Sequence, residues 1–272
     1  MRRTALLVPL AAAGLLLSAC GGDDDTTTPT DTGGSGSGAT DLGLISDGQL
    51  TVCSDIPYEP FEFEDADAPS GYSGFDIDLV QAIADNLELE VVVSVTGFDA
   101  LSSGTALEAD SCDMAASAMT ITEERKANIT FADPYYDSLQ SLLVPEDSDI
   151  ASIDDLAGKS VGVQGSTTGQ IYAEENAPED TEIVEFPGDT EMYAALQAGS
   201  VDALLQDLPV NLVHVEDGGF MIAEEYQTDE QYGFALKKED KEALLEAINE
   251  QLQALRDDGT YDEIYGMYFT VE

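Results

Sequence analysis

Segments typical of strands and of helices alternate along this chain from about residue 50, and this alternation restricts the possible folds more than any other feature. Leu50–Ser54 is a short β-rich segment, an amphipathic segment begins near Asp76, and Leu89–Thr96 is again typical of a strand. The apolar residues of the middle segment recur with the period of a helix, at Val80, Ile83, Ala84 and Leu87. Strand, helix and strand in this order predict a crossover between parallel strands.

The alternation continues towards the end of the chain. Strands are expected at Cys112–Ala118, Leu139–Val144, Ser160–Val163, Asp202–Gln206 and Phe220–Ala223. Helices are expected from Thr122, around Ile153–Leu156, after the turn Gln164–Gly169, at Glu191–Ala198 and at Glu239–Arg256. A new strand, turn and helix beginning near residue 160 indicate two α/β units rather than one continuous sheet.

Ligands of such sheets bind beyond the carboxyl ends of the strands, so the site is expected in the segments that follow them. These segments are Asp55–Phe61, Phe98, Ala118–Arg125, Gly165–Thr168 and Asp207. Arg125 and Lys126 are the only basic residues between positions 4 and 158. Arg125 is either an anion clamp or the partner of a neighbouring acid such as Glu124. A guanidinium suits a carboxylate because its planar fork donates two parallel hydrogen bonds.

Three further features of these segments allow a binding role beside a structural one. Gly165–Thr167 opens a helix, where backbone N–H groups form a cradle for a carboxylate, or it is simply a turn. Asp207 ends an apolar strand and is placed to receive an ammonium group, or it forms an Asx turn or a helix cap. Aromatic faces at Tyr58, Phe61 and Phe98 suit a ligand side chain or cation, but core packing explains each equally well.

The N-terminus carries the signs of export and lipid attachment. Arg2 and Arg3 precede an apolar run, Ala5–Leu17, that ends in Ser-Ala-Cys, which is typical of a secretory signal with a lipobox at Leu17–Cys20. The run is shorter than the roughly 20 residues that span a bilayer. Residues 1–20 are therefore expected to be a signal peptide, with Cys20 lipidated. Residues 21–41 hold almost nothing to bury and are expected to form a flexible tether.

The composition excludes several classes of partner and chemistry. The chain has 56 acidic and 9 basic residues, a formal net charge of −47, so nucleic acid and anionic membrane surfaces are poor partners. This acidity suits either a saline exterior or simple solubility. One histidine and no clustered thiolates give no support for a transition-metal site, and no nucleophile motif or cofactor motif is present. Cys53 and Cys112 are either a disulfide or two buried thiols.

Six segments in register resemble the family 3 extracellular solute-binding proteins, the polar amino-acid receptors of ABC importers. The resemblance runs from about Gly48 to Phe269, through GQLTVCSDIPYEPFEF, GYSGFDIDLVQAIADNL, CDMAASAMTITEERKANITFADPYYDS, KSVGVQGSTTG, LQAGSVDALLQD and YGFALKKEDKEALLEAINEQLQALRDDGTYDEIYGMYF. It implies an α/β fold of the type II periplasmic-binding-protein kind. Each of its two lobes is a mixed, mainly parallel sheet flanked by helices, and two crossover strands join them.

The resemblance also sets the lobe limits. Lobe 1 is expected at residues 42–137 plus 229–272 and lobe 2 at 138–228, with crossings near Pro134–Ser138 and Glu225–Gln231. This moves the first boundary earlier than residue 160, because the strand at Leu139–Val144 then belongs to lobe 2.

Carried over residue by residue, the resemblance assigns the α-carboxylate of an amino acid to Arg125, with Thr120 from the same loop and Thr167 from the other lobe. It assigns the α-ammonium to Asp207. At Ala118 only the backbone carbonyl is able to contribute. Because the acid and the base come from different lobes, closure of the lobes depends on the ligand.

The side chain of the ligand is expected to meet Tyr58, Phe98 and Asp55. Tyr58 and Phe98 match aromatic walls, although the chain is about two residues longer than the usual pattern between Phe98 and Cys112. Asp55 matches a carboxylate at the distal end of polar or basic ligands. The chain is thus expected to be a monomeric, non-enzymatic receptor on the outer face of the cell membrane that delivers an L-amino acid to ABC permease subunits. The alternative is an enzyme on the same fold, such as a cyclic-carboxylate dehydratase.

Overall fold

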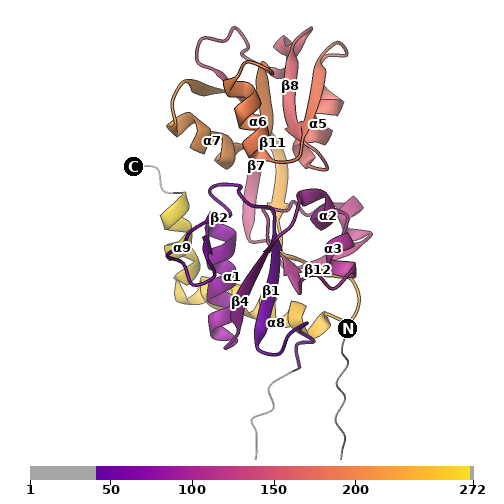
Figure 1. The fold of residues 1–272 in the computed structure, drawn as a ribbon, viewed down its shortest axis with the longest axis vertical. Helices are drawn as coiled ribbons and strands as arrows, with labels where there is room; N and C mark the ends of the chain where they lie inside the picture. Colours follow the sequence, from indigo (N-terminus) through magenta and orange to yellow (C-terminus); the bar gives the residue numbers. More distant parts are fainter. Residues whose placement is uncertain (1–40, 270–272) are drawn as a thin grey trace, which may run out of the picture. The chain divides into compact units, whose positions relative to one another are not determined.

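The structure is a computed structural model that describes residues 41–269 (Figure 1). These residues form two five-stranded sheets of mixed parallel and antiparallel strands, each flanked by helices. We call the sheet β4-β1-β5-β12-β6 with its helices lobe 1, and the sheet β11-β7-β10-β8-β9 with its helices lobe 2. The predicted signal peptide, the lipobox with Cys20 and the predicted tether up to residue 40 lie outside the described residues. Within 41–269, no helix is long and apolar enough to cross a membrane.

Lobe 1 contains the predicted crossover between parallel strands. Its strands are β1 (Gln49–Ser54), β4 (Glu90–Val95), β5 (Met114–Ala115), β6 (Ile129–Phe131) and β12 (Ala235–Lys237). The strand β1 pairs in parallel with both β4 and β5, whereas β12 is antiparallel to β5 and β6. A separate two-stranded sheet joins β2 (Phe63–Glu64) to β3 (Tyr72–Ser73).

Among the residues that the structure describes, six helices belong to lobe 1, and the longer ones pack on the sheet through apolar side chains. The six are α1 (Phe75–Asn86), α2 (Phe98–Ser102), α3 (Thr105–Glu108), α4 (Glu123–Lys126), α8 (Glu242–Asp258) and α9 (Thr260–Tyr268). The predicted apolar positions Val80 and Ile83 of α1 pack in one buried cluster with Ile248 and Leu252 of α8. Burying these side chains contributes about 1.5–3 kcal/mol each, which holds both helices on the sheet.

Lobe 2 has the same layered plan. Its strands are β7 (Tyr136–Pro145), β8 (Ser160–Gln164), β9 (Glu182–Phe186), β10 (Ala203–Asp207) and β11 (Phe220–Tyr232). Its helices are the 3₁₀ turn η1 (Ile153–Leu156), α5 (Thr168–Asn176), α6 (Asp189–Gln197) and α7 (Leu208–Glu216). The strand β8 is parallel to β9 and β10, and β7 is antiparallel to β10 and β11.

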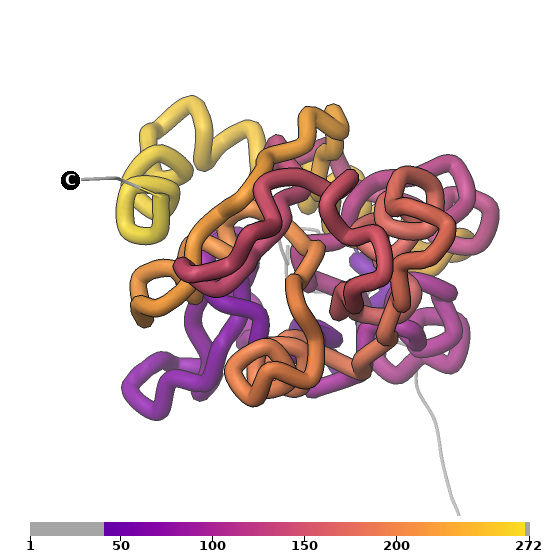
Figure 2. The backbone as a smooth tube through the Cα atoms, turned by 90° about the horizontal axis from the view of Figure 1, so that it is seen from above, coloured from indigo at the N-terminus to yellow at the C-terminus, as the bar shows by residue number. Residues whose placement is uncertain are grey.

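The strands β7 and β11 run side by side between the two lobes (Figures 1 and 2). Their pairing extends from Pro145 opposite Phe220 to Tyr136 opposite Tyr232, with two irregularities of register. Tyr232 also bridges to Thr120 of lobe 1. These two strands contain the segments at which crossings are expected, and we keep the predicted lobe limits, 42–137 plus 229–272 and 138–228, as a proposal.

Several predicted elements differ from the structure in length. The strand expected at Cys112–Ala118 is only Met114–Ala115, because the backbone turns at Ala118, whose φ is +44°. The strand expected at Phe220–Ala223 continues to Tyr232, since its pairing with β7 overrides a polar local sequence. The boundary near residue 160 that the alternation alone suggests is wrong, because β7 belongs to the second sheet.

The structure joins Cys53 and Cys112 by a disulfide. Both sulfurs are buried, and the bridge ties β1 to the start of β5 across 59 positions of the sequence. A crosslink of this span restricts the unfolded chain and thereby stabilises the folded one.

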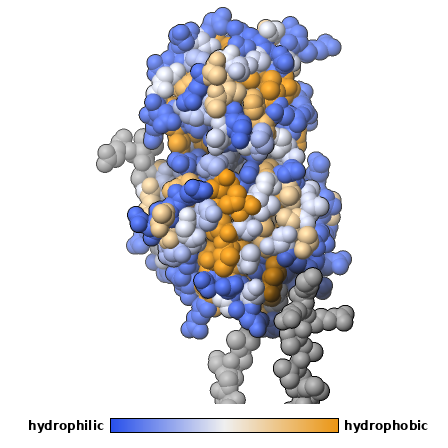
Figure 3. Space-filling view, in the orientation of Figure 1, coloured by the Kyte–Doolittle hydropathy of each residue, from blue (hydrophilic) through white to orange (hydrophobic). Residues whose placement is uncertain are grey.

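The face of the molecule seen in Figure 3 carries mainly polar residues. Hydrophobic atoms appear on it in limited patches. This agrees with the large excess of acidic residues in the composition.

Candidate functional site

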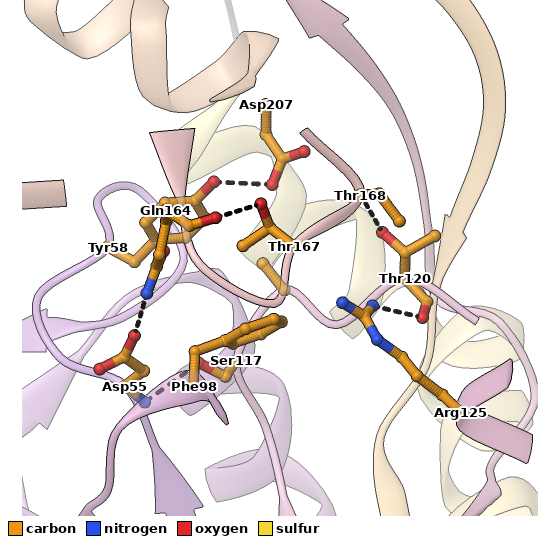
Figure 4. Close-up of a pocket in the computed structure, with 11 residues that line it drawn as sticks. Asp55, Tyr58, Phe98, Ser117, Thr120, Arg125, Gln164, Thr167, Thr168 and Asp207 are labelled. Carbon is orange, nitrogen blue, oxygen red and sulfur yellow. Dashed lines mark hydrogen bonds between the residues drawn. The ribbon is translucent and has the colours of Figure 1, made fainter. Parts of the chain in front are cut away.

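One pocket collects the predicted site residues (Figure 4). It is lined by Asp55, Tyr58, Phe98, Ser117, Ala118, Thr120, Arg125, Gln164, Thr167, Thr168 and Asp207. These residues follow β1, β4, β5 and β8, or stand at the last position of β8 and β10. The rule that ligands bind beyond strand ends therefore places the pocket correctly. All eight residues predicted to contact a ligand line it, and Ser117, Gln164 and Thr168 line it as well.

Arg125 is a buried cation that belongs to no ion pair among the described residues. Its Nη1 donates to the carbonyl oxygen of Thr120 at 2.8 Å and its Nη2 to that of Ser166, on lobe 2, at 3.0 Å. The guanidinium lies over the ring of Phe98, 5.1 Å from its centroid. Burial lowers the pKa of Arg125, and the nearby charge of Glu230 opposes that shift. The expected alternative, an ion pair with Glu124, is not what the structure contains.

The short helix α4 presents Arg125 to the pocket. Thr122 caps this helix, as its sequence position predicts, because its hydroxyl accepts the N–H of Arg125 at 3.1 Å. The hydroxyl of Thr120, in the loop before the cap, lies 3.4 Å from the hydroxyl of Thr168 on lobe 2.

Two buried acids accept hydrogen bonds from the loop that follows β5 and thereby fix its position. The N–H of Ala118 donates to Asp76 Oδ2 at 2.8 Å, and the hydroxyl of Ser117 donates to Glu62 Oε1 at 2.6 Å. Ser117 in turn accepts the N–H of Asp55 at 3.0 Å. The turn at Ala118 thus rests on side chains from elsewhere in lobe 1, which no local sequence pattern indicates.

Thr167 and Thr168 divide two tasks at the start of α5. Thr167 is the N-cap: its hydroxyl accepts the N–H of Gln170 at 3.1 Å and donates to the carbonyl of Gln164 at 2.8 Å. Its proton is therefore already used within lobe 2. Thr168, which lies in the predicted segment Gly165–Thr168 but was not assigned a ligand contact, is the residue whose hydroxyl faces Thr120 across the lobes. The sequence feature that indicates a role for Thr168 is its position directly after Thr167 at the start of the helix.

Asp207 is the N-cap residue of α7, but its side chain makes no capping hydrogen bond. Its Oδ1 accepts from Gln140 Nε2 at 2.6 Å and its Oδ2 from the hydroxyl of Tyr58, on lobe 1, at 2.7 Å. Burial, with the charge of Glu230 as the next cause, raises the pKa of Asp207 to about 7. A buried carboxyl held only by neutral donors is suited to an incoming ammonium group.

Asp55 and Gln164 form a further contact between the lobes. Gln164 Nε2 donates to Asp55 Oδ2 at 2.6 Å and to the carbonyl of Pro187 at 3.1 Å. Burial raises the pKa of Asp55 to about 6, against the hydrogen bond from Gln164, and the charges of Asp99 and Glu191 add to the rise. This end of the pocket is therefore electronegative.

The single histidine serves the structure of lobe 2. His214 is buried in α7, with Nε2 2.8 Å from Asp189 Oδ1, and its ring stacks on that of Tyr193. Across residues 41–269, no group of three or more His, Cys, Asp and Glu side chains is arranged to hold a metal ion.

Two α/β lobes connected by two strands, with a pocket that takes a buried cation from one lobe and a buried carboxyl from the other, define a type II binding protein for small solutes. The chain belongs to the bacterial extracellular solute-binding proteins, family 3, whose sequence profile matches residues 50–271.

Relatives of known name agree with this membership. A probable histidine-binding protein of Neisseria gonorrhoeae is 31% identical over 270 residues, covering 97% of this chain and 94% of the relative. An ancestral arginine-binding protein bound to arginine is 37% identical with a TM-score of 0.76, over 82% of this chain and 99% of that one. An ancestral amino acid-binding protein described as a precursor of cyclohexadienyl dehydratase is 35% identical with a TM-score of 0.73, over 82% and 96% of the two chains.

Proposed function

We propose that this protein captures a free L-amino acid, polar or basic in its side chain, between its two lobes and delivers it to an ABC permease. The observation that carries the proposal is the placement of Arg125 and Asp207 on one pocket from opposite lobes. A zwitterion has one carboxylate and one ammonium, so a buried cation and a buried carboxyl recognise it together. Binding energy that is realised only when both lobes contact the ligand shifts the molecule towards its closed form.

In this proposal Arg125 and Thr120 hold the α-carboxylate and Asp207 the α-ammonium. Thr167 contributes through its position at the start of α5, where backbone N–H groups favour negative charge, and Ala118 through its carbonyl. Tyr58 and Phe98 flank the side chain. Tyr58 has a second task, since its hydroxyl donates to Asp207.

The distal end of the pocket favours a cationic side chain over an anionic one. Asp55 faces it, and Asp99 and Glu191 add negative charge nearby. Arginine, lysine, ornithine and histidine are therefore the first candidates, and glutamine remains compatible through Gln164. The names of the related arginine- and histidine-binding proteins support the same group.

Lipid attachment at Cys20, a monomeric state and a place on the outer face of the cell membrane complete the proposal. They rest on the lipobox at Leu17–Cys20 and on the character of the family. Labelling with a radioactive fatty acid tests the anchor, because Cys20→Ala should remain unlabelled.

A dehydratase acting on a cyclic carboxylate is the second candidate, favoured by the similarity to the dehydratase precursor. Asp207, with its pKa raised to about 7, would act there as a general acid. Mass spectrometry of the ligand after incubation separates the two functions, because a receptor releases its ligand unchanged.

A thermal-shift screen with the twenty amino acids and ornithine tests the proposed function. A ligand at 100 times its Kd stabilises the native state by about 2.7 kcal/mol, which raises the melting temperature by several degrees. We expect the largest shift with a basic amino acid. Absence of a shift with every amino acid would sink the proposal.

The variant Asp55→Asn is expected to weaken the binding of L-arginine about 10- to 100-fold and that of L-glutamine less than threefold, because it removes the charge but keeps the shape. Isothermal titration calorimetry with both ligands measures this. Asp147→Asn, which makes the same chemical change at an exposed position outside the pocket lining, is the control. Equal losses for both ligands would contradict a role of Asp55 in selecting the side chain.

Affinity is also expected to fall with acidification. The ammonium group needs the ionised form of Asp207, whose pKa is raised to about 7, so the carboxyl is largely protonated at pH 5.5. The expected loss between pH 7.5 and 5.5 is roughly 20-fold for L-glutamine, measured in the Asp55→Asn background to remove the second titrating carboxyl. Binding at pH 5.5 should release a proton, which titrations in buffers of different ionisation enthalpy detect. A flat profile would exclude Asp207 as the partner of the ammonium.

A further inference from the structure

Glu230 joins the two lobes at the back of the pocket. It lies on the crossing strand β11, and its side chain is buried. Its Oε2 accepts the hydroxyl of Thr120, from lobe 1, at 2.7 Å and that of Thr168, from lobe 2, at 2.8 Å. Gln140 Nε2, on the other crossing strand, approaches the same oxygen at 3.3 Å.

These contacts occupy groups that an amino acid would need. A threonine hydroxyl has one proton, so it donates to one acceptor at a time. While Thr120 donates to Glu230, its proton is not available to the carboxylate of a ligand. The same holds for Thr168, the other hydroxyl on this side of the pocket.

Glu230 also competes through its charge. Among the acidic groups whose charge raises the pKa of Arg125, Glu230 has the largest effect and Asp207 the next. Neither carboxylate lies within ion-pair distance of the guanidinium. A second carboxylate placed near Arg125 and Thr120 would be repelled by Glu230 at short range in a buried setting. The charge of Glu230 therefore already acts on the cation, although from beyond ion-pair distance.

We propose that Glu230 is an internal competitor of the ligand carboxylate: it holds the hydroxyls of Thr120 and Thr168, and a bound amino acid must take the Thr120 hydroxyl from it. The inference rests on the proposed function, since it concerns the same carboxylate site. In this role Glu230 lowers the affinity of the protein for its amino acid, and the lower affinity favours release of the ligand once the lobes reopen. None of the residues selected from the sequence has this role.

Glu230→Gln keeps an oxygen that is able to accept both hydroxyls, but it removes the charge and thereby weakens both hydrogen bonds, so the affinity for L-arginine is expected to rise about tenfold. Glu230→Ala, which frees both hydroxyls, should raise it as well. In the Thr120→Val background the gain from Glu230→Gln should be smaller, because no Thr120 proton remains to be freed. Glu225→Gln, an exposed change on the same strand, is the control and should leave affinity unchanged.

Calorimetry with L-arginine, and with L-glutamine as a second probe, separates the outcomes. A higher affinity in Glu230→Gln supports the proposal, since the loss of a merely structural contact would lower affinity. Unchanged or weaker binding in Glu230→Gln and Glu230→Ala, with melting curves showing both variants folded, overturns it. Failure of the wild-type protein to bind any amino acid instead overturns the proposed function. In that case acetate, an isolated carboxylate, is titrated into the wild-type protein and into Glu230→Gln, and tighter binding of acetate by the variant still tests the competition at Arg125.

Discussion

Replacing Arg125 by alanine is expected to abolish the binding of every amino acid, whatever its side chain. All amino acids have the α-carboxylate, and Arg125 is the buried cation that faces the pocket with two donors at fixed geometry. Removing one partner of a buried, hydrogen-bonded charge pair costs about 4 kcal/mol, which is roughly a 1,000-fold loss of affinity. Calorimetry with L-arginine and L-glutamine should show the same loss for both.

Two matched variants make this result specific. Arg125→Lys keeps the charge but not the planar fork, so an intermediate loss is expected. Arg256→Ala removes an exposed arginine that donates to the carbonyl of Pro134 outside the pocket, and it should leave affinity unchanged. Melting curves show whether the loss of the Thr120 and Ser166 contacts unfolds the protein. Normal affinity in a folded Arg125→Ala variant would remove Arg125 from the site.

Variants of Arg125 and of Asp55 are expected to give different patterns of affinity loss across a set of amino acids, because the two residues face opposite ends of the ligand. A change at the carboxylate clamp affects all ligands equally, whereas a change at the distal carboxyl affects them according to side-chain charge. The pair of variants therefore separates recognition of the amino-acid backbone from recognition of its identity.

Residues at strand ends were predictable from sequence because the geometry of parallel sheets brings them together. Asp55 follows β1, Asp207 ends β10 and Arg125 follows β5 by one loop, and all three line one pocket. The capping role of Thr122 and the parallel pairing of β1 with β4 were predictable for similar local reasons.

Other parts of the site depend on contacts between distant segments, and these have no local signal. Glu230 lies in a polar stretch that forms a strand only because it pairs with β7. Whether Cys53 and Cys112 form a bridge depends on the distance between their strands, which no spacing in the sequence gives. The turn at Ala118 is held by Glu62 and Asp76, from two other segments of lobe 1.

Glu62 and Asp76 form a buried pair of acids beneath the pocket. Both side chains are fully buried, and the N–H of Asp76 donates to the carbonyl of Phe61, the neighbour of Glu62, at 3.0 Å. Tyr135 and Ala118 donate to Asp76 Oδ2, and Ser117 donates to Glu62 Oε1. Glu62 Oε2 and Asp76 Oδ1 have no partner among the described groups.

Burial raises the pKa of both acids of this pair. The pKa of Asp76 rises to about 7, against the hydrogen bonds from Tyr135 and Ala118. The pKa of Glu62 rises well above its usual range, with the charge of Asp76 as the second cause and those of Asp55 and Asp207 as smaller ones. Two buried carboxyls that raise each other's proton affinity and have no counter-charge retain a proton between them.

The free energy of unfolding is therefore expected to fall as the pH rises. Below pH 4 the acids are protonated in both the folded and the unfolded chain, so they make no difference to the slope. Between pH 4 and about 7 the folded chain keeps protons that the unfolded chain has released, and stability declines with rising pH. Urea unfolding at constant ionic strength should give a higher value at pH 5 than at pH 8, and the pair should contribute about 3 kcal/mol of this difference.

Glu62→Gln should reduce the pair's contribution to the change in free energy of unfolding between pH 5 and pH 8 by at least half, and it should stabilise the protein at pH 8. The amide oxygen of glutamine still accepts the Ser117 hydroxyl, and because the amide is neutral, Asp76 then ionises without a like-charged neighbour. Glu64→Gln makes the same chemical change two residues away at an exposed position and should leave the slope as in the wild type. Identical slopes in the two variants would show that the pair beneath the pocket does not set the pH dependence, and Asp55, Asp78 and Asp207, the other acids with raised pKa, would then account for it.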